Sequence, residues 1–282
     1  MFEVFPPKSV VVGIDGSQAA IRAALWAVDE VAGTDIPLQL LYVRSLSPTA
    51  SRSETRMAMM TAEEAVHEAY NAITANGKPV KVEMEIVEGR PVPALIRASE
   101  STPMLCIGDT GAGQSSPAGF GSTATELVHS AHCSLAIIRG DRNDELTDSR
   151  LIVAHVAGSA DDDDVLEFAF GEANRRNAPL LLMTAWRSGF DDLQNDRLII
   201  DHERRMRTIL DRYVARWTPH YPDVDVRTIP AYGTFFDYLT EHAKIVQLVI
   251  VGATQAREMQ QLIGPDGDHA LQHSDFALLV VR

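Results

Sequence analysis

The chain has little of what marks three common classes of protein. It contains only two cysteines, Cys106 and Cys133, which fit no CxxC spacing, so buried free thiols are expected rather than a disulfide framework. No stretch approaches the ~18 uninterrupted apolar residues of a membrane span, and the N-terminal MFEVFPPKS lacks the layout of a secretion signal. The expected location is therefore the cytoplasm.

Basic residues are also scarce. Lys and Arg number 25 against 39 Asp and Glu, which gives a net charge of -14, and only four of the 25 are lysines. Binding to nucleic acid and to anionic lipid depends on clustered Lys and Arg, so neither is an expected partner. Hydrophobic residues make up 45% and charged residues 23%, a composition typical of a folded, soluble protein.

The sequence contains one module twice. Residues 10–44 align without a gap on residues 152–186, so that Gly16-Ser17 falls on Gly158-Ser159. Further on, residues 87–99 match residues 231–243, and residues 135–139 match residues 278–282. A repeat of this length indicates two domains of the same fold. We expect them over residues 1–142 and 150–282, joined by an acidic, polar linker at 141–149.

Each copy alternates strands with helices, which favours an α/β fold with a parallel sheet covered on both faces. In the first copy we expect helices at 19–31 and 54–75 and strands at 10–14, 38–43, 80–87, 104–108 and 135–138. The strand at 80–87 alternates apolar and charged residues, which predicts a half-exposed edge strand.

The long helix at 54–75 is rich in methionine. Its spacing predicts that Met57, Met60, Ala65 and Ala69 face inward. Met57, Met60 and the intervening Met59 are interpreted as packing residues rather than as a binding groove.

Glycines and one carboxylate follow two strands of the first copy. Asp15 comes directly after the first strand, and Gly108, Gly111, Gly121 and Ser122 follow the fourth in the spacing G-x2-G-x9-G-S. Ligands of an open parallel sheet bind beyond the carboxyl ends of its strands. Glycine lets backbone N–H groups approach an anion, and a helix that begins at Ser122 offers its free N–H groups to phosphate. The pattern therefore predicts a phosphate-binding site.

This pattern resembles that of the universal stress protein family, whose nucleotide-binding members carry G-x2-G-x9-G-(S/T) and an aspartate after the first strand. The resemblance covers nearly the whole chain, as tandem copies of the mycobacterial type. It implies two Rossmann-like domains, each a five-stranded parallel sheet of strand order 3-2-1-4-5, with ATP and Mg²⁺ in the first. The residues implied in binding are Gly13 and Asp15, Val43 beside adenine, Gly108, Gly111, Gly121 and Ser122 around ribose and phosphates, and Thr123 as a further helix donor.

The second copy departs from this pattern. It has Ala157 in place of Asp15, Gln255 in place of Gly111 and Pro265 in place of Ser122, and its loop is one residue shorter. Proline removes a donor that would face phosphate. We therefore expect one nucleotide per chain, in the first copy.

Simpler interpretations stay open for parts of the pattern. Asp15 could cap the following helix, and Gly108 and Gly111 could serve a tight turn.

Two further groups resemble metal sites. Residues 161–164 are four consecutive aspartates, but the glycine and distal Glu of a calcium loop are missing, so a solvated helix start is expected. His129, His132 and Cys133 have no evident fourth ligand for zinc and are interpreted as residues at a helix end.

No GxSxG, HExxH or GxxxxGK[ST] motif occurs, so no enzymatic activity is expected beyond very slow ATP hydrolysis. The predicted function is sensing of stress or growth state. ATP would order residues 47–54 and 112–120 and so change a surface that a regulatory protein recognises. A homodimer is compatible with this interpretation. The alternatives are a module that binds AMP or cyclic AMP through the same glycines, and a scaffold that binds no nucleotide.

Overall fold

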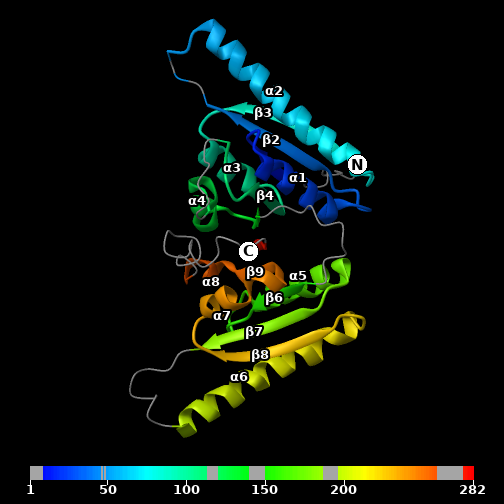
Figure 1. The fold of residues 1–282 in the computed structure, drawn as a ribbon, viewed down its shortest axis with the longest axis vertical. Helices are drawn as coiled ribbons and strands as arrows, with labels where there is room; N and C mark the ends of the chain where they lie inside the picture. The colour runs from blue at the N-terminus through cyan, green and yellow to red at the C-terminus, as the bar shows by residue number, and fades with distance from the viewer. Residues whose placement is uncertain are drawn as a thin grey trace, which may run out of the picture. The chain divides into compact units, whose positions relative to one another are not determined.

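The fold is that of a computed structural model (Figure 1), which describes residues 9–45, 47, 49–112, 120–139, 150–186, 196–258 and 276–282. By its internal contacts the chain divides into two compact units, residues 1–141 and 142–282. Most of the expected linker, residues 141–149, lies outside the described residues.

The first unit is a five-stranded parallel sheet with helices packed on it. Its elements are β1 (Val10–Ile14), α1 (Gln18–Val31), β2 (Leu38–Arg44), α2 (Arg52–Ala75), β3 (Val82–Glu88), α3 (Pro91–Ser99), β4 (Met104–Gly108), α4 (Ser122–Ser130) and β5 (Ser134–Ile138). The strand order is β3-β2-β1-β4-β5, which confirms the order that the family resemblance implies. β3 lies at one edge of this sheet, as its alternating sequence predicts.

The second unit repeats this architecture. Its elements are β6 (Leu151–His155), α5 (Asp162–Arg176), β7 (Leu180–Trp186), α6 (Asp196–Trp217), β8 (Val226–Tyr232), α7 (Phe235–His242), β9 (Val246–Gly252), α8 (Ala253–Glu258) and β10 (Ala277–Val281), with short 3-10 turns at Thr218–His220 and Ala243–Ile245. The strands run parallel in the order β8-β7-β6-β9-β10. Strand for strand, this is the order of the first unit.

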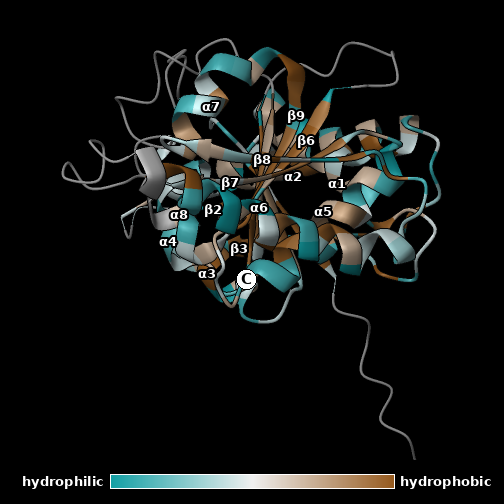
Figure 2. Ribbon diagram, turned by 90° about the horizontal axis from the view of Figure 1, so that it is seen from below, coloured by the Kyte–Doolittle hydropathy of each residue, from teal (hydrophilic) through white to brown (hydrophobic). Residues whose placement is uncertain are grey.

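The apolar core of each unit lies between its strands and helices. β5 and β9 are buried along their whole length, and Figure 2 shows the strands mainly in the hydrophobic colour while the helices mix both colours. Cys106 and Cys133 are buried free thiols. Within the part of the chain that the structure describes, no helix is both apolar and long enough to cross a membrane.

The expected inward position of Met57 and Met60 is wrong. Met57 is 70% exposed and Met60 is 59% exposed, while Met59 is half-buried. The buried residues of α2 are Ala62, Ala65, Val66, Ala69 and Ile73, all in the later part of the helix. The helix begins two residues before the expected position because Ser51 and Glu54 form a capping box. None of the residues before Ala62 in this helix is buried, although their sequence has helical periodicity.

Candidate functional site

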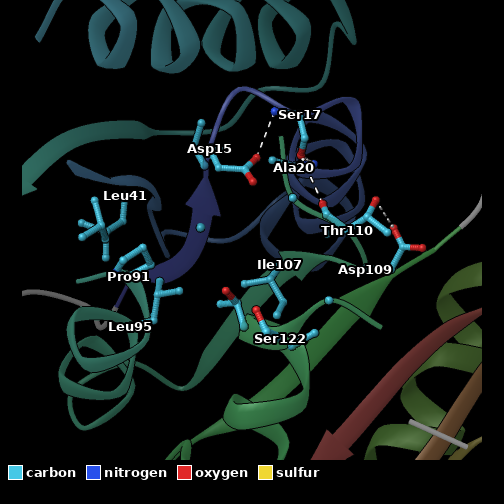
Figure 3. Close-up of a pocket in the computed structure, with 18 residues that line it drawn as sticks. Asp15, Ser17, Ala20, Leu41, Pro91, Leu95, Ile107, Asp109, Thr110 and Ser122 are labelled. Atoms are coloured by element: carbon cyan, nitrogen blue, oxygen red, sulfur yellow. Dashed lines mark hydrogen bonds between the residues drawn. The ribbon is translucent and has the colours of Figure 1, made fainter. Parts of the chain in front are cut away.

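The first unit contains a cavity of about 210 Å³ at the carboxyl ends of β1 and β4 (Figure 3). The chain leaves β1 towards β2 and leaves β4 towards β5, so this is the point where the connections of the sheet diverge. Every predicted binding residue lines the cavity: Gly13, Asp15, Val43, Gly108, Gly111, Gly121, Ser122 and Thr123. Ligand pockets typically measure ~300 to 1,000 Å³, so the cavity would enclose only part of a nucleotide.

One side of the cavity is apolar. β2 contributes Leu41 and Val43, α3 contributes Pro91 and Leu95, and β4 contributes Ile107. Only Val43 is identified from the sequence, because the other four look like ordinary core residues there. A wall of this kind suits a flat, largely apolar group such as a purine base.

The Asp15 carboxylate fixes the loop that borders the cavity. Its Oδ1 accepts a hydrogen bond from the backbone N–H of Ser17 at 2.9 Å, and its Oδ2 accepts one from the N–H of Ala112 at 3.0 Å. The N-cap of α1 is Ser17, whose side chain accepts from the N–H of Ala20, so the interpretation of Asp15 as the helix cap is wrong. A carboxylate has about four acceptor positions, which leaves room for ligand hydroxyl groups.

The N-terminus of α4 supplies backbone donors to the cavity. The N-cap is Gly121, and no side chain caps this helix among the described residues. The N–H groups of a helix's first turn have no partner within the helix. Ser122, Thr123 and Ala124 all line the cavity, so these donors and the positive end of the helix dipole favour an anion there.

The two glycines of the G-x2-G pair have different roles. A Cβ atom on Gly108 would lie 2.6 Å from the backbone carbonyl carbon and the Cβ of Ala19, so this glycine is required for the packing of α1 on β4. A Cβ atom on Gly111 would lie 3.0 Å from Oδ2 of Asp15 and would meet no other atom within 4 Å. The absence of a side chain at Gly111 thus leaves room for the Asp15 carboxylate, whose Oδ2 accepts from the N–H of Ala112. The sequence offered a tight turn as the role of Gly108, but its contact with Ala19 of α1 gives it a packing role.

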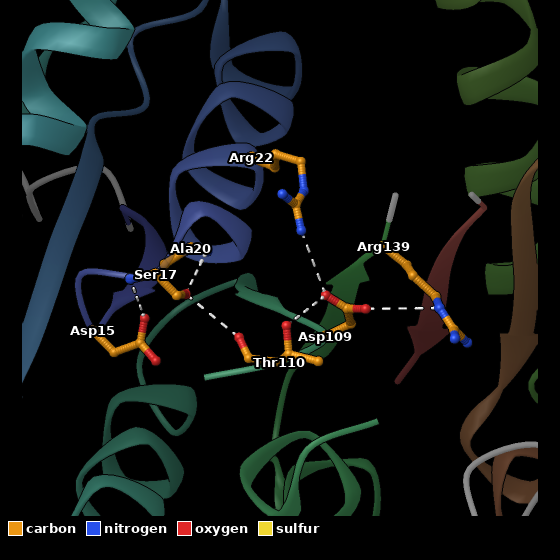
Figure 4. A network of polar contacts seen from close by, with 7 residues as sticks. All are labelled: Asp15, Ser17, Ala20, Arg22, Asp109, Thr110 and Arg139. Atoms are coloured by element: carbon orange, nitrogen blue, oxygen red, sulfur yellow. Dashed lines mark hydrogen bonds and ion pairs between the residues drawn. The ribbon is translucent and has the colours of Figure 1, made fainter. Parts of the chain in front are cut away.

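A second aspartate of the cavity is held by two arginines. Figure 4 shows the carboxylate of Asp109 between Arg22, at 3.8 Å, and Arg139, at 3.7 Å. Burial raises the pKa of Asp109, and the two guanidinium groups oppose that shift. Arg139 also lies over the ring of Phe120, at 5.8 Å from its centroid. These ion pairs connect α1 with the ends of β4 and β5 next to the cavity. The three residues are distant in the sequence, so no local motif predicts their contact.

The cavity wall contains no cationic side chain among the described residues. Arg22 and Arg139 are close by, but their guanidinium groups bind Asp109. Phosphate groups would therefore meet backbone N–H groups rather than Lys or Arg. Among the described residues, no group of three or more His, Cys, Asp or Glu side chains is placed so that it could hold a metal ion. His129, His132 and Cys133 are all described residues and form no such group.

In the second unit, two aromatic rings take the positions of residues that line the cavity of the first. His155 takes the place of Gly13 in the repeat, and Phe235 takes the place of Pro91. Their rings stack with centroids 4.7 Å apart, and Nε2 of His155 accepts a hydrogen bond from the N–H of Ala185 at 3.4 Å. The two rings lie where the first unit has the apolar side of its cavity.

The loop after β6 binds a carboxylate of the same unit. Asp162, which takes the place of Ala20, is 2% exposed. Its oxygens accept from the N–H groups of Ala157 at 3.2 Å and Gly158 at 2.8 Å, and from the hydroxyls of Ser159 and Tyr213, each at 2.8 Å. The expected solvated helix start is therefore wrong for Asp162, because the carboxylate satisfies donors of the preceding loop.

Two further side chains tie the loops of the second unit together. Asp161 accepts from the Thr254 hydroxyl at 2.8 Å, and the side-chain amide of Gln255 donates to the Ser159 hydroxyl at 3.3 Å. Pro265, the residue expected to remove a phosphate donor, lies outside the described residues. In the described loops of the second unit, backbone N–H groups of Ala157, Gly158 and Thr254 donate to aspartate side chains of the same unit.

The buried His155 predicts a pH dependence for the second unit. Burial lowers its pKa from 6.5 to about 4, against an opposing effect of Asp162. The unfolded chain therefore binds this proton first as the pH falls, and the unit should lose up to about 3 kcal/mol of stability between pH 6.5 and pH 4. Thermal unfolding of wild type and His155→Gln across this range measures the difference, since Gln retains an acceptor. The exposed His132→Gln is the control, and equal pH profiles for wild type and His155→Gln would contradict the prediction.

Comparisons with known proteins agree with this fold. A family model described as the Universal stress protein family matches residues 7–139. The universal stress protein Rv2028c of Mycobacterium tuberculosis is 40% identical over 279 residues, which cover 98% of this chain and 96% of that protein. Rv2624c of the same organism is 36% identical over 276 residues, with the same coverage. A solved universal stress protein from Archaeoglobus fulgidus has a TM-score of 0.69 at 18% identity and covers 98% of this chain and 96% of that one.

Proposed function

Because this chain belongs to the universal stress protein family, we propose that its first unit binds ATP and that ATP occupancy regulates a response to stress or growth state. The observation that carries the proposal is the cavity at the divergence of β1 and β4, where an apolar wall, a carboxylate and an uncapped helix N-terminus converge. We further propose that the protein works in the cytoplasm.

The three parts of the cavity match the three parts of an adenine nucleotide. The wall that includes Leu41, Val43 and Leu95 suits the base. The free acceptor positions of Asp15 suit the ribose hydroxyl groups. The first N–H groups of α4 suit phosphate. Since no cationic side chain of the described wall neutralises the phosphates, we propose that Mg²⁺ accompanies ATP and is held chiefly by the phosphate oxygens.

The regulatory step would involve residues 113–119. Gly111 and Ala112 precede this segment and Gly121 follows it, and a nucleotide in the cavity would contact both ends. We propose that ligand binding changes the surface that residues 47–54 and 112–120 present to a regulatory protein. Residues 52–54 already form the first turn of α2, so no ordering is expected there, and residues 113–119 lie outside the described residues. We propose that the protein is not an enzyme, because the two carboxylates of the wall already bind backbone groups or arginines.

A substitution at the start of α4 tests phosphate binding. Ser122 is the first helical residue, where proline fits well, and Gly121 already has the extended conformation that a following proline requires (φ -59°, ψ 160°). Ser122→Pro should therefore leave the fold intact and remove one N–H donor. A charge-assisted hydrogen bond contributes about 1.5 to 3 kcal/mol, so ATP affinity should fall about 10- to 100-fold by calorimetric titration.

Two controls make this result specific. Ser122→Ala keeps the N–H and should bind ATP within about threefold of wild type. Adenosine, which has no phosphate, should bind wild type and Ser122→Pro equally. If Ser122→Pro binds ATP as well as Ser122→Ala does, the phosphates do not lie at α4.

The lack of cationic side chains also favours a ligand of lower charge. AMP or cyclic AMP would use the same wall and the same helix N-terminus, and would need no Mg²⁺. Competition of AMP and cyclic AMP against Mg-ATP distinguishes these ligands. A scaffold that binds none of them would give no heat with any of the three.

A further inference from the structure

The connection from β4 to α4 has both of its ends against the same arginine. Asp109 directly follows β4, and Phe120 directly precedes Gly121, the N-cap of α4. Arg139 directly follows β5. Its Nε lies 3.7 Å from Oδ2 of Asp109, and its guanidinium carbon lies 5.8 Å from the centroid of the Phe120 ring. One side chain from a third element therefore contacts the residue that leaves the sheet and the residue that enters the helix.

Both of these contacts are buried. Arg139 and Phe120 are each 8% exposed, and Asp109 is 7% exposed. An ion pair and a cation–π contact are both stronger where little water screens the charge. Separation of a buried ion pair is also costly, because it leaves an uncompensated charge in the interior. Arg139 is therefore a fixed contact of Asp109 and Phe120 rather than a freely moving surface side chain.

The backbone of Asp109 continues this connection to the cavity. Its N–H donates to the carbonyl of Ile138 in β5 at 3.0 Å, and its own carbonyl accepts from the N–H of Gly121 at 2.7 Å. The next three residues, the first of α4, line the cavity. A displacement of Asp109 or of Phe120 would therefore move the N–H groups that face the cavity.

We propose that Arg139 is a positioning residue for phosphate binding. By holding Asp109 and Phe120 it fixes the N-terminus of α4, and with it the backbone donors, before the ligand arrives. This inference rests on the proposed binding of a nucleotide in the first unit. Arg139 is not among the residues that line the cavity, so it acts through its two neighbours and not by contact with the ligand. Donors that are held in place bind more tightly than donors that the ligand must first order.

Removal of the guanidinium group tests this role. In Arg139→Met, ATP affinity should fall about tenfold by calorimetric titration, while the affinity for adenosine, which has no phosphate, should stay within about twofold of wild type. A residue that merely supports the fold would affect both ligands alike.

Arg22→Met is the matched control. It removes the same charge from the other oxygen of the same carboxylate, since Arg22 lies 3.8 Å from Oδ1 of Asp109. Arg22 has no contact with an aromatic ring among the described residues, and Arg139 stays in place in this variant. Arg22→Met should therefore bind ATP within about threefold of wild type, although any long-range attraction of phosphate is reduced as much as in Arg139→Met.

Two further variants guard against a general loss of structure. Arg139→Lys should bind ATP within about threefold of wild type, because an ion pair at 3.7 Å and a ring contact at 5.8 Å need a positive charge rather than a two-pronged guanidinium. If Arg139→Met does not fold, D109N/R139M removes the carboxylate charge together with its partner. This double variant should show the same selective loss of ATP binding.

A second measurement needs no nucleotide. Hydrogen exchange of the Gly121 N–H, followed by NMR in the nucleotide-free chain, reports on its bond to the Asp109 carbonyl. Exchange should be at least about tenfold faster in Arg139→Met than in wild type or Arg22→Met. Wild type that binds no ATP would refute the proposed function, and the exchange rates would still decide whether Arg139 fixes α4.

Three results would overturn the positioning role of Arg139. The first is equal ATP affinity of Arg139→Met and Arg22→Met. The second is an equal loss of ATP and adenosine binding in Arg139→Met. The third is exchange of the Gly121 N–H in Arg139→Met at the rate of wild type.

Discussion

Asp15→Ala should weaken ATP binding about 30- to 100-fold. The carboxylate accepts from the N–H groups of Ser17 and Ala112 and keeps further acceptor positions for the ligand. Alanine removes the ligand contacts and also releases the turn that carries Gly111 and Ala112. Loss of hydrogen bonds to a charged group costs about 2 to 3 kcal/mol, which corresponds to this change in affinity. Calorimetric titration with Mg-ATP measures it.

A matched control separates this effect from a general loss of negative charge. Asp35 belongs to the same unit, its side chain is 94% exposed, and its only described contact is an ion pair with Lys81. Asp35→Ala should bind ATP as wild type does. Thermal unfolding should show little change for either variant, because Asp15 is exposed. Equal affinity of Asp15→Ala and Asp35→Ala would show that the carboxylate does not take part in binding.

Gly108→Ala should destabilise the first unit by about 3 kcal/mol or more. The added Cβ would overlap backbone atoms of Ala19 at 2.6 Å, and backbone atoms of a packed helix move less easily than a side chain. Overpacking of a well-packed core typically costs ~1 to 3 kcal/mol, and displacement of α1 from β4 adds to this. Thermal and denaturant unfolding should therefore show a marked loss of stability.

Two other glycines give contrasting controls. Gly111→Ala meets only a side-chain oxygen of Asp15, so it should weaken ATP binding and leave the unfolding temperature almost unchanged. Gly171 lies in α5 with no atom within 4 Å of an added Cβ, so Gly171→Ala should stabilise the second unit by about 0.5 to 1 kcal/mol. If Gly108→Ala is as stable as Gly111→Ala, the packing role assigned to Gly108 is wrong.

Local sequence signals predict most of the fold because the strands are nearly uniform apolar runs. β1 and β4 have their expected bounds, and the edge position of β3 follows from its alternation of charged and apolar residues. Met57 and Met60 could not be placed in this way. Helical periodicity shows which side of a helix is apolar, but not where the helix extends beyond the sheet that it covers.

Part of the candidate site could be predicted because its residues directly follow the predicted strands. Asp15 and the glycines follow strand ends, and the carboxyl ends of parallel strands meet at one edge of the sheet. Leu41, Pro91 and Leu95 reach the same cavity from elements distant in the sequence, where nothing distinguishes them from core residues. The roles of Gly108 and Asp109 depend on contacts with α1 and β5, which spacing does not encode.

The second unit shows what a comparison of motifs leaves out. Missing motif residues such as Ala157 and Gln255 predict weaker nucleotide binding. They do not reveal that Asp162 satisfies the donors of the loop after β6, or that the ring of His155 stacks on Phe235 and accepts from a backbone N–H of β7. A site filled by buried, hydrogen-bonded side chains opposes a ligand more strongly than a site that has lost one contact, because those bonds must break before the ligand enters.

The number of ATP molecules bound per intact chain tests the central claim most directly. Titration of the full chain with Mg-ATP, followed by mass analysis of the complex under native conditions, should give one nucleotide per chain. At a concentration that just saturates wild type, most of the Asp15→Ala chains should carry no nucleotide. Two nucleotides per chain, or one that persists in Asp15→Ala, would contradict the account.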